Sequence, residues 1–263
     1  MGGDGRPSVL IIAGLDPSGG AGLLADVRVC EQHDCRPVGV ATALTEQSTA
    51  VVRAANPAPP EVVGDQLRTL LTDVEVTAVK IGMLGSEAIA DEVARALELT
   101  AAPVVWDPVL RATAGRVALY AGAPARAIEL LDGHVALFTP NADEAWALTG
   151  IRIDTVGDAA AAGLALYQRG MGAVLVKGGH WGGAAEAIDV LVTPDGVDEL
   201  RAPRMAMDGA GGVHGTGCAL STAIACELAA GASLVEACRA AKAYVAALIA
   251  DAVYPGRGRG AVL

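Results

Sequence analysis

Short runs of β-branched and aliphatic residues alternate along the chain with longer Ala- and Leu-rich stretches of helical period. This alternation is typical of repeated strand–helix units, which form a mostly parallel sheet covered by helices. The predicted strands are residues 8–13, 37–43, 76–81, 104–107, 135–139 and 173–177. The predicted helices are residues 22–32, 60–73, 86–98, 123–131, 142–149, 158–169, 217–230 and 233–251.

Two further strands are predicted between the sixth strand and the penultimate helix. Residues 187–192 and 197–202 are extended runs separated by Thr-Pro-Asp-Gly at 193–196. Pro-Asp-Gly between two such runs is a hairpin signal, so the parallel sheet should carry an antiparallel edge. No linker, repeat or charge block divides the chain. We therefore predict one α/β domain over residues 1–263, a three-layer αβα sandwich, with flexible ends at 1–7 and 256–263.

Composition narrows the class of protein. Hydrophobic residues make up 52% of the 263 residues, but no window has the continuous apolar length needed to span a bilayer. The N-terminus lacks an apolar signal segment, and Arg6 stands where a myristoylation motif requires Ser or Thr. The net charge of −11, with no run of Lys or Arg, argues against a nucleic-acid partner. These features predict a cytoplasmic enzyme with no membrane association.

The five cysteines are an odd number without a Cys-x-x-Cys pair, which favours a reducing compartment. Cys30, His33 and Cys35 lie close enough in sequence to be considered as metal ligands. No second cluster completes a tetrahedral set, so we interpret this segment as the end of a helix.

Polar or glycine-rich segments follow each of the six predicted parallel strands. They are residues 14–22, 45–49, 82–85, 107–109, 139–144 and 177–180. The first of them resembles a phosphate loop but lacks the Gly-Lys-Ser/Thr end of a Walker motif. Because ligands bind at the carboxyl ends of parallel strands, six such segments at one sheet edge indicate a ligand site.

Gly215-Thr216-Gly217-Cys218 opens the apolar helix predicted at 217–230. The first backbone N–H groups of a helix are unpaired, and together with the helix dipole they form a phosphate-binding point. The same dipole lowers the pKa of a thiol in the first turn, so Cys218 is predicted to be reactive. The alternative is a glycine-rich loop followed by a cysteine that fills space in the core.

The segments at the sheet edge and at the start of the 217–230 helix contain motifs that run in a fixed order along the chain. They are Ile-Ala-Gly-x-Asp-Pro-Ser-Gly-Gly-Ala-Gly-x-x-Ala-Asp (12–26), Thr-Ala-Leu-Thr-x-Gln-x-Thr (42–49), Lys-Ile-Gly-Met-Leu (80–84), Asp-Pro-Val (107–109), Thr-Pro-Asn-x-x-Glu (139–144), Val-Lys-Gly-Gly-His (176–180) and His-Gly-Thr-Gly-Cys (214–218). Together they resemble the hydroxymethylpyrimidine and phosphomethylpyrimidine kinases of thiamine biosynthesis, which belong to the ribokinase-like superfamily. The combination of the 12–26 motif with the Cys form of Gly-Thr-Gly is specific, because the sugar kinases of that superfamily usually carry Asp in place of Cys. The C-terminal Gly-x-Gly-x-Gly-x-Val at 256–262 also resembles the family.

The resemblance implies ATP-dependent phosphorylation of 4-amino-5-hydroxymethyl-2-methylpyrimidine and then of its monophosphate to the pyrophosphate. It also implies that the protein uses ATP and Mg²⁺ and forms a homodimer. The residues implied in substrate binding are Gln47, Gly14, Asp26, Thr45, Met83 and Val109. Those implied in ATP binding are Lys177, Asp107, Asn141 and Arg111, and Glu144 is implied to organise Mg²⁺ through water. Gly215, Thr216, Gly217 and Cys218 are implied to hold the transferring phosphoryl group.

The residue chemistry is consistent with these roles but leaves alternatives open. The amide of Gln47 can donate to and accept from an aminopyrimidine edge, and the thiol of Cys218 can orient or deprotonate the substrate hydroxymethyl group. Met83 is equally compatible with a core position, Asp26 with the surface of a helix, and Glu144 with an ordinary carboxylate in a first helical turn.

Two departures from the family pattern lie near the expected anion sites. Residues 111–115 read Arg-Ala-Thr-Ala-Gly where the family has Ala-Lys-Ser-Gly, and Gly212-Val213 stand where it favours Asn-Thr. Arg111 could replace the displaced base. The second phosphorylation and the substrate itself therefore remain open, with a kinase of pyridoxal or a related heterocycle as the nearer alternative and a catalytically silent nucleotide-binding module as the more distant one.

Overall fold

Nine strands of the described part of the chain form one sheet. The computed structural model describes residues 5–110, 117–179, 185–205 and 212–261. The sheet order is β11-β10-β9-β8-β6-β4-β1-β2-β3, in which β9, β8, β6, β4, β1 and β2 are parallel. The strands are β1 (Ser8–Leu15), β2 (Arg36–Gln47), β3 (Val52–Pro57), β4 (Ala78–Ile81), β6 (Val104–Trp106), β8 (Val135–Phe138), β9 (Val174–Val176), β10 (Glu186–Thr193) and β11 (Gly196–Pro203).

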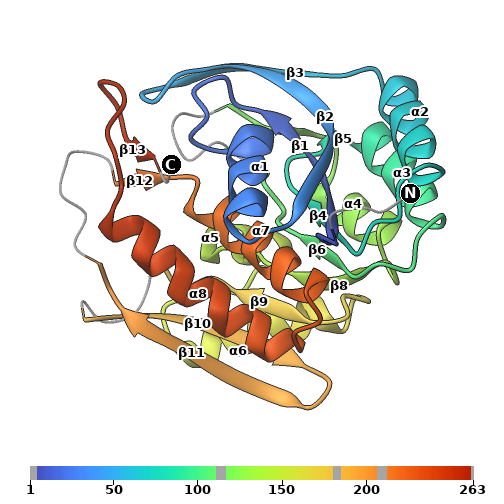
Figure 1. Cartoon of the computed structure of the whole chain (residues 1–263). Coiled ribbons are helices and arrows are strands. Elements are labelled where there is room, and N and C mark those ends of the chain that lie inside the picture. Colours follow the sequence, from blue (N-terminus) through green and yellow to red (C-terminus); the bar gives the residue numbers. More distant parts are fainter. Residues whose placement is uncertain (1–4, 111–116, 180–184, 206–211, 262–263) are drawn as a thin grey trace.

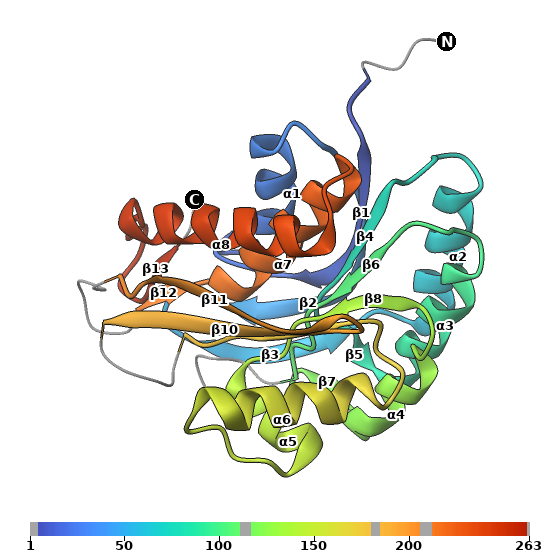
Figure 2. The ribbon, with the colours of Figure 1, turned by 90° about the horizontal axis from the view of Figure 1, so that it is seen from below.

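Helices cover both faces of this sheet, which confirms the predicted three-layer αβα sandwich (Figures 1 and 2). One face carries α1 (Gly22–Gln32), α7 (Thr216–Ala229) and α8 (Leu234–Ala250). The other carries α2 (Pro60–Leu71), α3 (Glu87–Leu97), α4 (Pro124–Leu130), α5 (Ala142–Thr149) and α6 (Val156–Tyr167). Among the described residues, no helix combines the length and apolar character needed to cross a bilayer.

The central strands are apolar on both sides because each side contacts a helical layer. In β1, Val9 and Ile11 pack in the cluster that includes α7 and α8, whereas Leu10 and Ile12 pack in the cluster that includes α2 and α3. Side chains alternate between the faces of a strand, so a strand buried on both faces reads as a continuous hydrophobic run. The sequence pattern therefore located β1 correctly.

The antiparallel hairpin of β10 and β11 is confirmed at one edge of the sheet. The opposite edge carries β3, which pairs antiparallel with β2 and was not predicted. Its sequence, Val-Arg-Ala-Ala-Asn-Pro, has no apolar alternation, and most of its residues are at least partly exposed. An edge strand of this kind leaves little hydrophobic signal in the sequence.

Two short parallel ladders lie outside the main sheet. One joins β5 (Gly85–Ser86) to β7 (Tyr120–Ala121), and the other joins β12 (Val213–His214) to β13 (Gly260–Ala261). Within the end predicted to be flexible, 256–263, residues 256–261 contact the turn at Thr49 and pair with β12. The C-terminal segment is therefore part of the folded structure as far as Ala261.

Candidate active site

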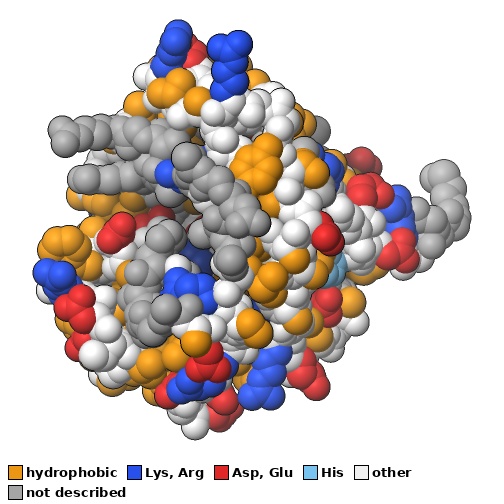
Figure 3. Space-filling model, turned by 90° about the vertical axis from the view of Figure 1, so that its left-hand side faces the viewer, with side chains coloured by type: hydrophobic (Ala, Val, Ile, Leu, Met, Phe, Trp, Pro, Cys, Tyr) orange, Lys and Arg blue, Asp and Glu red, His pale blue; other side chains and the backbone are white. Residues whose placement is uncertain are grey.

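A pocket of about 440 Å³ lies at the carboxyl ends of the parallel strands, between them and the N-terminus of α7. Basic side chains are visible near the centre of this face of the molecule, with apolar and acidic side chains around them (Figure 3). The pocket brings together most of the residues predicted from the sequence. They are Gly14, Thr45, Gln47, Met83, Asp107, Val109, Asn141, Glu144, Lys177, Gly215, Thr216, Gly217 and Cys218.

The turn that opens α7 has the geometry of an anion-binding site. Gly215 is the N-cap with φ 86°, and a Cβ there would lie 1.9 Å from the carbonyl oxygen of Gly20, so only glycine fits. Among the described residues, no side chain caps the first turn of α7. The leading N–H groups of a helix have no intrahelical partner, and residues 215–218 line the pocket, so this turn can bind a phosphate there.

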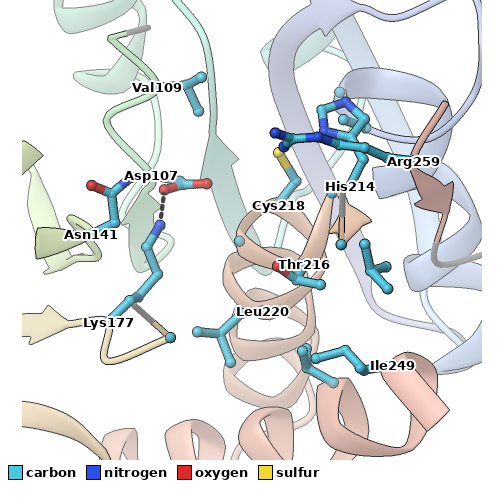
Figure 4. Close-up of a pocket in the computed structure, with 18 of the residues that line it drawn as sticks. Asp107, Val109, Asn141, Lys177, His214, Thr216, Cys218, Leu220, Ile249 and Arg259 are labelled. Atoms are coloured by element: carbon cyan, nitrogen blue, oxygen red, sulfur yellow. Dashed lines mark hydrogen bonds and ion pairs between the residues drawn. The ribbon is translucent and has the colours of Figure 1, made fainter. Parts of the chain in front are cut away.

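Lys177 and Asp107 form an ion pair directly beside this turn (Figure 4). Lys177 Nζ lies 2.5 Å from Asp107 Oδ1, and a Cβ on Gly217 would lie 3.2 Å from the same Nζ. Burial lowers the pKa of Lys177, but the carboxylates of Asp107 and Glu144 outweigh it, so the pKa is raised and the ammonium stays charged. The absence of a side chain at Gly217 places this cation next to the anion-binding turn.

Asn141 and Glu144 form a capping box at the start of α5. The backbone N–H of Glu144 donates to Asn141 Oδ1 (2.9 Å), and the backbone N–H of Asn141 donates to Glu144 Oε2 (2.8 Å). Burial raises the pKa of Glu144 to about 7, although the charge of Lys177 opposes the shift. Both side chains line the pocket while they cap the helix, so capping does not remove them from the site.

The predicted effect of the helix dipole on Cys218 is not what the structure gives. Burial raises the pKa of Cys218 to about 11, and the nearby ammonium of Lys80 only partly offsets this shift. A helix N-terminus favours the thiolate, but the loss of solvent around the sulfur disfavours it and has the larger effect here. Cys218 is therefore a neutral thiol near neutral pH.

Asp26 does not line the pocket, contrary to the prediction. It lies on the inner face of α1 with no exposed surface, so the alternative of a helix-surface residue is wrong as well. Asp26 Oδ2 is 2.5 Å from Lys80 Nζ, and Asp26 Oδ1 accepts a hydrogen bond from Thr222 (2.8 Å). Lys80, for which no role was predicted, lines the pocket. Arg111, the remaining predicted residue, lies outside the described residues.

On the side of the pocket opposite Lys177, the side chains of Gln47, His214 and Asp16 form a polar group. The Gln47 amide nitrogen lies 3.0 Å from His214 Nε2, which is also 3.5 Å from Asp16 Oδ2. Burial raises the pKa of Asp16, but hydrogen bonds from His214 and Ser18 outweigh it and lower the pKa. Asp16 and His214 stand in motifs noted in the sequence, yet neither was predicted as a site residue. Only the fold brings them to Gln47.

Met83 lies both in a hydrophobic cluster and at the pocket surface. It packs in a small hydrophobic cluster with Ala43, Val52 and Leu119, and it lines the pocket beside Gly14. A Cβ on Gly14 would lie 3.0 Å from the Met83 sulfur, so the two residues are in close contact. Together they give this side of the pocket an apolar wall suited to a flat ring.

The end of the pocket that is formed by the β10–β11 hairpin and α8 was not predicted from the sequence. There Asp189 of β10 accepts a hydrogen bond from the backbone N–H of Gly178 (2.7 Å) and pairs with Lys242 of α8 (2.7 Å). Apolar residues of the hairpin and of α8 complete this end, including Ala187, Val245 and Ile249. Asp189 lies in a strand and Lys242 in a helix, and neither belongs to a local motif. The sequence alone therefore does not indicate that they meet.

The segment considered for metal binding has other contacts. His33 Nδ1 lies 3.2 Å from Glu227 Oε1, and Cys30 Sγ lies 3.7 Å from Cys226 Sγ. Within the described ranges, no group of three or more His, Cys, Asp or Glu side chains is arranged to hold a metal ion.

Comparison with known proteins agrees with this geometry. The model of the family described as phosphomethylpyrimidine kinase matches residues 16–263. The hydroxymethylpyrimidine/phosphomethylpyrimidine kinase of Streptomyces coelicolor is 40% identical over 258 residues, which cover 97% of this chain and 93% of that protein. The chain spans 46% of a longer relative, a thiamine biosynthetic bifunctional enzyme of Arabidopsis thaliana.

Solved structures show the same ribokinase-like fold. Pyridoxal kinase from Staphylococcus aureus in complex with AMP-PCP superposes with a TM-score of 0.87 at 28% identity, covering 97% of this chain and 92% of that one. Phosphomethylpyrimidine kinase from Clostridium difficile gives 0.79 at 33% identity, covering 93% and 100%. The anion-binding turn, the adjacent lysine and the match along almost the whole sequence lead to one conclusion: the chain belongs to the phosphomethylpyrimidine kinase family.

Proposed function

We propose that this kinase transfers the γ-phosphoryl group of ATP to the hydroxymethyl group of 4-amino-5-hydroxymethyl-2-methylpyrimidine and then phosphorylates the monophosphate, as a step of thiamine biosynthesis. The single observation that carries the proposal is one pocket with the α7 turn, Lys177 and Cys218 at its middle and Gln47 at one end. A phosphoryl group held at the turn lies between the two ends, as in-line transfer requires. The names of the relatives supply the substrate class.

Catalysis in this arrangement rests on positioning and charge. The N–H groups of the α7 turn and the ammonium of Lys177 stabilise the charge that spreads over the transferring phosphoryl oxygens. Gln47 and the apolar wall of Met83 orient the ring. The neutral thiol of Cys218 orients the substrate hydroxyl group, and only its small thiolate fraction can accept the hydroxyl proton.

The acidic residues beside Lys177 fit a hydrated magnesium ion. Asp107 and Glu144 both line the pocket and both influence the pKa of Lys177, so two oxygen donors lie close to the cation that would meet the nucleotide. Mg²⁺ prefers oxygen ligands and keeps much of its water, so we assign Asp107 and Glu144 to hold it, Glu144 through water. When bound, the ion neutralises charge on the phosphates.

A pyridoxal kinase is the second candidate, because the S. aureus pyridoxal kinase has a TM-score of 0.87 to this chain. Both substrates are flat heterocycles with a primary alcohol. The test is a phosphate-transfer assay with the pyrimidine alcohol, its monophosphate and pyridoxal at equal concentrations. A higher kcat/KM for pyridoxal than for the pyrimidine alcohol contradicts our proposal, and ATP turnover independent of all three contradicts both.

Gln47→Ala is expected to weaken binding of the pyrimidine alcohol while leaving ATP affinity unchanged. Loss of the amide leaves polar atoms of the bound ring unpaired, which costs on the order of 1–3 kcal/mol. Calorimetric titration with each ligand measures the two affinities separately. Glu46→Ala is the matched control, because Glu46 is the exposed neighbour. Equal losses for the alcohol and for ATP show that Gln47 does not contact the ring.

Glu144 is expected to make nucleotide use depend on pH near neutrality. Its pKa of about 7 means that it is protonated below that pH and ionised above it, and only the ionised form attracts Mg²⁺. The kcat/KM for ATP, which reports the free enzyme, should therefore rise as the pH increases through 7. Glu144→Gln keeps a capping oxygen but cannot ionise, so it should remain at the low plateau. A variant with the same rise as the wild type rules out Glu144 as the titrating group.

A further inference from the structure

The C-terminal segment brings Arg259 into the pocket near the ring-binding end. The backbone N–H of Arg259 donates to the carbonyl oxygen of Thr49 (3.0 Å), two residues after Gln47. The next residue, Gly260, donates to the carbonyl oxygen of Gly212 (3.2 Å) and begins β13, which pairs with His214 through Ala261. Arg259 is therefore fixed between the strand end that carries Gln47 and the strand that leads into the anion-binding turn.

Close packing prevents this segment from shifting along the Thr49 turn. A Cβ on Gly258 would lie 2.2 Å from the Thr49 carbonyl oxygen, so the two backbones are in direct contact. Figure 4 shows the Arg259 side chain extending into the space that His214 and Cys218 also line. Arg257, two residues earlier, is exposed and does not line the pocket.

The other charged side chains of the pocket determine what Arg259 can contribute. The three lysines that line the pocket each pair with a carboxylate: Lys80 with Asp26, Lys177 with Asp107, and Lys242 with Asp189, at 2.5, 2.5 and 2.7 Å. At the ring-binding end, Asp16 adds a further negative charge beside His214. A substrate that enters this end with a phosphate group needs additional positive charge to offset the nearby carboxylates.

The two proposed substrates differ in this respect. The alcohol is uncharged at the reacting group, whereas a phosphate monoester carries about −1.5 to −2 charges at pH 7. A guanidinium group matches phosphate oxygens with two parallel hydrogen bonds. We propose that Arg259 binds the phosphate group of the monophosphate and thereby determines the efficiency of the second phosphorylation; this inference rests on the proposed function.

Arg259→Ala tests the inference through the preference between the two substrates. The ratio of kcat/KM for the monophosphate to that for the alcohol should fall roughly 10- to 100-fold, as expected for loss of hydrogen bonds to a charged group. The loss should appear mainly as a higher KM for the monophosphate. Arg259→Lys retains the charge but not the paired geometry, so its ratio should be intermediate. Arg257→Ala is the matched control and should leave the ratio unchanged.

Calorimetric titration of the monophosphate without nucleotide provides a second readout, in which Arg259→Ala should weaken binding and Arg257→Ala should not. The inference is overturned if Arg259→Ala reduces use of both substrates by the same factor, or if it changes neither. It is also overturned if Arg257→Ala lowers the ratio equally, because the effect is then one of general charge. If the wild-type enzyme phosphorylates neither pyrimidine substrate, the proposed function itself is wrong.

Discussion

Replacing Cys218 with alanine is expected to slow phosphorylation of the pyrimidine alcohol by roughly 10²–10⁴-fold, the usual contribution of a group that accepts a proton. The attacking alcohol oxygen must lose its proton, and Cys218 lines the pocket at the anion-binding turn. The attacking oxygen of the monophosphate is already anionic near neutral pH, so it needs no base. The second reaction should therefore slow much less than the first. Single-turnover rates with the two substrates measure the difference.

The pH dependence of the same rates separates proton transfer from positioning. Because the pKa of Cys218 is about 11, the thiolate fraction increases throughout the neutral and alkaline range. If the thiolate acts as the base, the alcohol rate of the wild type should rise with pH, and Cys218→Ala should abolish this rise. Equal slowing of both reactions would instead identify Cys218 as part of the phosphoryl-binding turn. No slowing of either would leave it a packing residue.

Replacing Lys80 with methionine is expected to destabilise the protein by roughly 3–5 kcal/mol, because it leaves the carboxylate of Asp26 buried without its partner. Both side chains have no exposed surface, and their charged atoms are 2.5 Å apart. Burial lowers the pKa of Lys80, but Asp26 outweighs it and raises the pKa, so the lysine is charged in the folded state. Urea denaturation, followed by two spectroscopic signals, measures the free energy of unfolding.

A double substitution provides the control for this prediction. Asp26→Asn combined with Lys80→Met removes both charges while an amide oxygen remains to accept the hydrogen bond from Thr222. The double variant should therefore be more stable than Lys80→Met alone. If the two single losses simply add in the double variant, the ion pair does not account for the destabilisation.

Local patterns in the sequence predicted the layers of the fold and several element bounds. The helices at 22–32 and 142–149 were predicted with the bounds that the structure has, because a glycine-rich loop precedes one and a capping box opens the other. The edge strand β3 was missed because it has little buried surface. A hydrophobic pattern indicates that an element is buried against its neighbours, so it does not predict elements with little buried surface.

Some residues of the candidate site could also be placed from the sequence, and others could not. Residues that follow a strand, such as Asp107 and Lys177, could be placed at one sheet edge from topology alone. Asp26 could not be placed, because its partner Lys80 is distant in sequence and on another element. The pKa of Cys218 could not be predicted either, since it depends on how much solvent the surrounding fold removes.

The position of α7 between its neighbours has a consequence for the thermodynamics of ligand binding. Every residue from Ala219 to Cys226 is buried, on all sides of the helix, so the first turn continues into a segment that cannot fray without opening the core. The backbone entropy of the turn is consequently lost once, when the chain folds. A nucleotide arriving there meets donors that are already oriented, and little of its binding energy is consumed in ordering them.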